Sequence, residues 1–121
     1  MFDQTIVTKG LDIRTNISLP SSTVMKITSD GKIWAQEIIV QTTDPWPDYV
    51  FNVDYKLLPL NELANYINRN NHLPGMPSAE EVAANGINLG QMDARLLQKI
   101  EELTQYIIEL QKEIDSLKKN K

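Results

Sequence analysis

Few side chains in this sequence have the type and spacing that chemistry requires. Asp44, Asp48 and Asp54 lie in one short stretch, but their spacing matches no calcium-binding loop. His72 is the only histidine, and no cysteine or carboxylate cluster accompanies it as a metal site would need; we expect it to cap or pack against a helix end. The chain has no cysteine and no P-loop or Rossmann glycine pattern. We therefore expect no enzyme activity, no cofactor and no metal.

Three aromatic residues form a second cluster with binding potential. Trp46, Tyr49 and Phe51 fall within six residues, and Pro45 and Pro47 flank the tryptophan. Two interpretations stay open. The rings fill a small core, or they form a platform on which a sugar ring of a surface glycan stacks.

The strongest pattern lies in the C-terminal tail, residues 91–121. Isoleucine recurs every seven residues and leucine does the same, offset by alternating steps of three and four. This places isoleucine at the a positions and leucine at the d positions of a coiled coil. No proline or glycine interrupts the pattern. The predicted oligomerisation residues are Leu96, Ile100, Leu103, Ile107, Leu110, Ile114 and Leu117.

The elements before the tail predict an α+β chain in three parts. Residues 1–41 are a β-rich fibre or attachment segment, with strands expected near 4–8, 11–19, 24–28 and 33–40 and a turn at Asp30-Gly31. Residues 42–90 contain the aromatic loop and a small helical knob. Its first helix starts at Leu58 and ends near Asn71, and its second begins at a capping box, Ser78 to Glu81. Residues 91–121 are the oligomerisation helix.

Charge and hydropathy exclude several classes of protein. The 121 residues carry a formal charge of −4, and the tail from residue 91 is neutral, so the imbalance lies in the first ninety residues. A basic face typical of nucleic-acid binding is therefore not expected. No apolar run approaches the ~20 residues that span a bilayer, and the first residues do not predict a signal peptide.

The order of these parts resembles a C-terminal module of phage tail fibres and related bacterial surface fibre proteins. The segments that carry the resemblance are 31–37, 46–51, 72–78, 88–92 and 96–104. The general plan is similar to the S74 intramolecular-chaperone domain of tail spikes. The resemblance implies β-strands intertwined in an oligomer, a small helical knob and a parallel trimeric coiled coil. It also implies a virion structural protein with a part in host attachment.

Some members of the wider family cut themselves with a serine and a nearby lysine. The matching place here is Thr43-Asp44, followed by Pro45, and Lys56 is the candidate partner. Because this context departs from the family pattern, we expect no autocleavage at Thr42 or Thr43.

Two arguments favour different numbers of chains in the coiled coil. Isoleucine at a with leucine at d favours two strands in a parallel coil, whereas the resemblance implies three. Leu97, Thr104 and Tyr106 widen the apolar face and favour a third helix. We expect a parallel homotrimer, with a dimer as the alternative.

The expected role is a structural fibre or fibre tip on a phage or phage-like particle, or alternatively on a bacterial cell surface. Its N-terminus would dock onto other particle proteins. The alternatives are a receptor-binding module for a host-surface glycan and a heteromeric coiled-coil adaptor. No nucleic-acid partner and no membrane insertion are expected.

Overall fold

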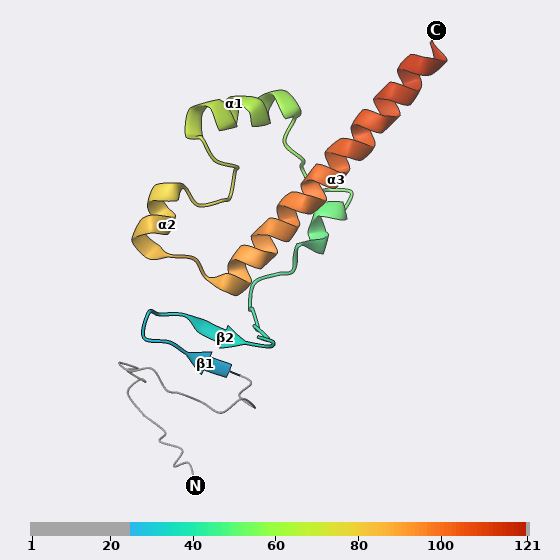
Figure 1. Cartoon of the computed structure of the whole chain (residues 1–121). Coiled ribbons are helices and arrows are strands. Elements are labelled where there is room, and N and C mark those ends of the chain that lie inside the picture. The colour runs from blue at the N-terminus through green and yellow to red at the C-terminus, as the bar shows by residue number, and fades with distance from the viewer. Residues whose placement is uncertain (1–24, 121) are drawn as a thin grey trace. The chain divides into compact units, whose positions relative to one another are not determined.

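The structure, a computed structural model, describes residues 25–120. The elements follow one another as β1 (Met25–Ile27), β2 (Ile33–Ala35), the 3-10 helix η1 (Pro47–Phe51), α1 (Leu60–Asn70), α2 (Ala79–Asn85) and α3 (Leu89–Lys119) (Figure 1). The described part is thus mostly helical, with one short hairpin. The strands predicted near 4–8 and 11–19 lie outside the described residues. The chain divides into two units between Ile39 and Val40, and each is treated by itself.

The first unit contains an antiparallel hairpin, as the sequence predicts. β1 pairs with β2 so that Ile27 lies opposite Ile33. The amide of Gly31 donates to the carbonyl of Thr28 at 3.0 Å, and Gly31 has a φ of 83°, which favours glycine. The second strand was expected to continue to Val40 but ends at Ala35. Beyond that residue no described strand lies beside it to continue the ladder.

Capping residues predict the end of α1 and both ends of α2, whereas α1 begins at Leu60, two residues after the expected Leu58, because Pro59 takes its N-cap position without a side-chain cap. α1 ends at Asn71, whose φ of 58° is left-handed, a conformation that asparagine tolerates. The Ser78 hydroxyl accepts from the Glu81 amide at 3.2 Å, and the Glu81 carboxylate accepts from the Ser78 amide at 2.8 Å. The capping box at the start of α2 is therefore confirmed.

The long helix α3 is continuous over 31 residues, a length of roughly 46 Å at 1.5 Å per residue. It begins at Leu89, two residues before the expected start of the tail. Asn88 takes the N-cap position, but its side chain makes no capping hydrogen bond. A Cβ atom on Gly90 would lie 2.7 Å from Cγ1 of Val40. Only glycine at this position lets the segment around Val40 approach the first turn of α3 so closely.

The buried core lies where η1 packs on α3. Among residues 27–120 only five are buried: Pro47, Val50, Ala94, Glu101 and Tyr106. Trp46 and Phe51 are instead 53% and 51% exposed. The interpretation of the aromatic cluster as a core plug is therefore wrong for the single chain, because a proline and a valine of η1 occupy the contact instead.

Candidate functional site

An exposed apolar seam runs along α3 from Leu96 to Leu117. The seven residues predicted at its a and d positions are all exposed, by between 44% and 66% of their surface. They are Leu96, Ile100, Leu103, Ile107, Leu110, Ile114 and Leu117. Aliphatic side chains at this spacing form one continuous stripe on a helix, so an apolar stripe lies exposed along α3 of the single chain.

The rest of the same chain covers the opposite side of α3. Ala94 and Glu101 are buried, and both occupy the heptad position b. A shallow hollow beside them is lined by Pro47 and Tyr49 of η1 together with Ala94, Arg95 and Gln98 of α3. At about 100° per residue, these b, c and f positions point away from the a and d positions. The packing of η1 therefore leaves the seam free.

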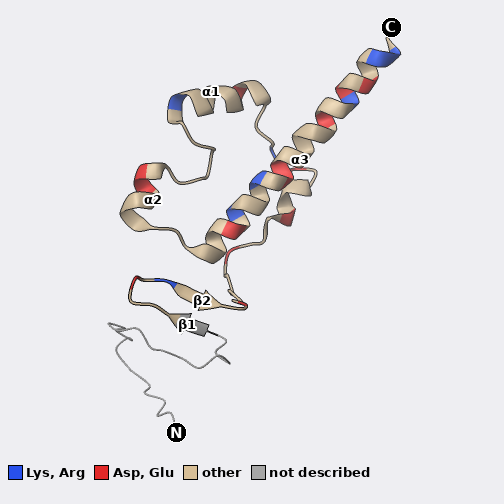
Figure 2. Cartoon of the chain, in the orientation of Figure 1, with Lys and Arg blue, Asp and Glu red and all other residues tan. Residues whose placement is uncertain are grey.

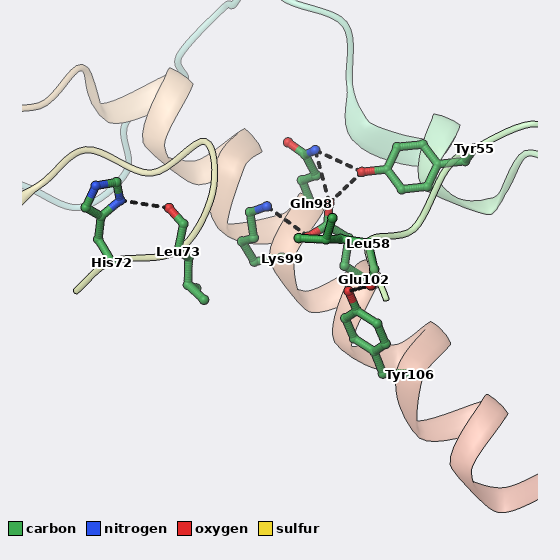
Figure 3. Close-up of polar contacts among 8 residues, drawn as sticks. All are labelled: Tyr55, Leu58, His72, Leu73, Gln98, Lys99, Glu102 and Tyr106. Atoms are coloured by element: carbon green, nitrogen blue, oxygen red, sulfur yellow. Dashed lines mark hydrogen bonds and ion pairs between the residues drawn. The ribbon is translucent and has the colours of Figure 1, made fainter. Parts of the chain in front are cut away.

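Tyr55 ties the segment after η1 to α3. Its hydroxyl donates to Oε1 of Glu102 at 2.5 Å and accepts from Nε2 of Gln98 at 3.2 Å (Figure 3). Lys99 completes the cluster with an ion pair of 2.8 Å to Oε2 of Glu102. Burial, and then the hydrogen bond to Glu102, raise the pKa of Tyr55 to about 12. The ring of Tyr55 also lies 5.9 Å from that of Tyr49, so the cluster joins η1 to the helix.

Tyr106 forms a second attachment nearer the middle of α3. It is buried, and its hydroxyl donates to the carbonyl of Leu58 at 2.5 Å (Figure 3). Burial raises the pKa of this tyrosine above its ordinary value. Tyr106 lies at a g position, beside the seam. By holding Leu58, it places the start of the segment leading into α1 on the g flank of α3.

Glu101 is an acid in an unfavourable place. It is only 7% exposed, and its Oε2 has no hydrogen-bond partner among the described residues. Burial raises the pKa of the Glu101 carboxyl, and the negative charge of Asp48 raises it further. Sequence reasoning missed this residue because an acid at position b of a coiled coil is ordinarily solvated.

The other candidate residues do not converge on one site. Of the three clustered aromatics, only Tyr49 lines the hollow beside Ala94. His72 packs edge-on against Tyr66 with ring centroids 5.8 Å apart, and its Nδ1 lies 3.0 Å from the carbonyl of Leu73, to which it donates (Figure 3). Within the described range, no hydrogen bond or ion pair joins Thr43 to Lys56.

Charged groups along α3 are mixed in sign. Figure 2 shows Lys and Arg interspersed with Asp and Glu along the helix. Within residues 25–120, no group of three or more His, Asp or Glu side chains is placed to hold a metal ion. No helix in the same range is long and apolar enough to cross a membrane.

No protein-family model, curated protein sequence or solved structure matches the chain. The fibre resemblance therefore stays a prediction, and the seam of α3 is the feature on which a function is proposed.

Proposed function

We propose that the chain is the structural module of a homotrimeric fibre or fibre tip, carried by a phage or phage-like particle, in which α3 forms a parallel coiled coil. One observation supports this most strongly. All seven seam residues are exposed, whereas η1 covers the opposite side of the same helix.

The seam offers enough apolar surface to drive association. Full burial of a leucine or isoleucine side chain stabilises by ~1.5–3 kcal/mol. With about half of each side chain still exposed, pairing adds roughly 1 kcal/mol per residue, or about 7 kcal/mol per chain. A chain with only five buried residues among 27–120 gains a large part of its stability in this way.

Three chains explain two further features better than two do. Leu97 lies at an e position and is only partly buried by its own chain, so the apolar face extends beyond the a and d positions of a two-helix seam. The described sheet has only two strands, and an isolated two-stranded hairpin is marginally stable. Winding three such segments together would pair their open edges. In this arrangement α3 sets the register of the strands.

A spin label tests the coupling between α3 and the β segment. The chain has no cysteine, so a Gln36→Cys variant carries a single label just after β2. We expect one narrow interchain distance distribution in the otherwise unchanged chain. With the same label in an Ile107→Asp background, we expect no narrow interchain distance distribution. A narrow distribution that survives in the seam variant would contradict the proposed role of α3.

The particle assignment needs a separate experiment. Antibodies raised against the purified protein, with immunogold detection, are applied to phage and phage-like particles from the source culture. Gold at fibre ends supports the proposal. Gold confined to cell envelopes favours a bacterial surface fibre instead.

A glycan-binding role is the second candidate, and the exposure of Trp46 and Phe51 supports it. Exposed aromatic rings are the surfaces on which sugars stack. Binding on a surface-glycan array that Trp46→Ala abolishes would favour this role, with Trp34→Ala as the control. Flat binding curves would argue against it.

A further inference from the structure

The arm formed by residues 59–88, which carries α1 and α2, has an apolar face with nothing to cover it. None of the residues of α1 is buried, and Leu60 and Ile67 are 45% and 38% exposed. These two side chains lie on the same face of the helix as Leu63. Within the described residues, no other helix or strand packs against α1. Eleven residues are too few for a helix that is stable by itself, so α1 needs a partner surface.

Both ends of the arm are fixed to the same α3. At one end the hydrogen bond from Tyr106 holds Leu58, and at the other the arm continues directly into α3 at Leu89. A shallow hollow at the first end is lined by residues 57–61 together with Tyr106, Glu109 and Glu113. These three residues occupy heptad positions g, c and g, so the arm leaves α3 on its g flank. Figure 1 shows α1 and α2 on one side of α3 and η1 on the other.

The g flank of one helix faces the e flank of its neighbour in a parallel coiled coil. On that flank of α3 two large apolar residues lie outside the seam, Leu97 at position e and Ile108 at position b. Ile108, which lies nearer the height of Tyr106, is 44% exposed. In a parallel, in-register coil the neighbour's Ile108 stands within one helical turn of the height of Tyr106, where the arm begins. The start of α1 therefore lies close to an exposed isoleucine that belongs to another copy.

We infer that the arm is an interchain clasp: the face of α1 formed by Leu60, Leu63 and Ile67 packs on the e flank of α3, around Ile108, of a second copy of this chain. The occupant is a second copy because the same geometry that frees the seam also brings a neighbour's e flank to the point where the arm departs. The inference rests on the proposed parallel coiled coil. It extends that proposal by giving the helical knob a role, which is to lock each pair of neighbouring helices from outside.

A cross-linking experiment tests the clasp in the full chain. The mass of the double variant Leu63→Cys/Ile108→Cys is first measured by light scattering. The variant is then treated with a short bismaleimide reagent. A clasp predicts covalent oligomers on a denaturing gel. The matched control Asn65→Cys/Ile108→Cys, whose first cysteine lies on the opposite face of α1, is expected to cross-link much less.

The other outcomes each overturn the clasp in a distinguishable way. Cross-linking within one chain leaves the product at 13.8 kDa and shows that α1 folds onto its own α3. An uncross-linked oligomer removes the clasp but keeps the coiled coil, and leaves residues 1–24 or another protein as the cover for α1. A monomeric double variant whose unmodified parent is also monomeric refutes the coiled coil and the clasp together.

A second variant keeps the test valid if the cysteines disturb folding. Leu63→Asp is expected to speed the exchange of protomers between labelled and unlabelled oligomers by about tenfold, the change that ~1.4 kcal/mol of lost interface produces. Asn65→Asp introduces the same side chain on the opposite face and is expected to leave the exchange rate unchanged. Equal rates in the two variants would overturn the clasp.

Discussion

Replacement of Ile107 by aspartate is the sharpest perturbation of the seam. Ile107 lies at the centre of α3 and is 64% exposed in the single chain. Pairing is therefore expected to bury most of its side chain. In a trimer the variant places three carboxylates in one layer of the coiled coil.

The expected loss follows from the exposed fraction. Complete burial of an isoleucine is worth ~1.5–3 kcal/mol, so 64% of it amounts to about 1–2 kcal/mol per chain, or roughly 3–6 kcal/mol for three chains. Desolvation of the three carboxylates adds several kcal/mol more. A total above about 6 kcal/mol weakens assembly by a factor of more than ~10⁴.

Sedimentation equilibrium over a range of concentrations, with thermal melting followed by circular dichroism, measures this loss. The control is Ser116→Asp, which adds the same charge at an exposed c position outside the seam. We expect this control to assemble like the parent and Ile107→Asp to dissociate. An Ile107→Asp variant that remains a thermostable oligomer would refute the proposal that the seam drives assembly.

Three further predictions concern the contact between residues 47–58 and α3. Tyr106→Phe removes the hydrogen bond to Leu58 and is expected to lower the free energy of unfolding by about 1 kcal/mol, as read from denaturant midpoints; an unchanged midpoint would show that the bond contributes nothing. Ultraviolet titration of the parent is expected to show a phenol with a pKa of about 12 that Tyr55→Phe lacks, and its persistence in the variant would assign it elsewhere. Because burial raises the pKa of Glu101 above the ordinary value of 4.5, the folded chain holds that proton more tightly than the unfolded chain. Stability from this group should therefore fall as pH rises from below 4.5 through the folded pKa. Glu101→Gln should remove that fall in pH-dependent melts, and a melting profile identical to the parent's would contradict it.

Local signals account for the elements that the sequence predicts well. The capping box at Ser78, the left-handed Asn71 and the Asp30-Gly31 turn each depend on a few neighbouring residues, and the structure contains all three. The heptad pattern likewise predicts α3 within two residues of its start. These features need no knowledge of distant contacts.

Contacts between distant segments account for what the sequence did not predict. Tyr55 meets Glu102 across 47 positions and Tyr106 meets Leu58 across 48, and no periodic pattern marks either pair. The 3-10 helix η1 lies in the segment that the sequence predicts only as an aromatic loop, because Pro45 and Pro47 dominate the local signal. The packing of η1 on α3 decides which residues are buried. Pro47 and Val50 are therefore buried in this contact, where the sequence alone would favour the larger aromatic rings. Of the residues in the Tyr55 cluster, only those on α3 could be grouped from the sequence, because Gln98 and Lys99 lie four and three residues before Glu102 and so share a face of the helix.

The most direct test of the central claim is the absolute mass of the purified protein by light scattering behind a sizing column. A homotrimer predicts a mass near three times 13.8 kDa, unchanged on moderate dilution. A mass near twice 13.8 kDa would be consistent with a coiled coil and would support the dimer. A monomer would contradict the account, because the seam of α3 would then need a different protein as its partner.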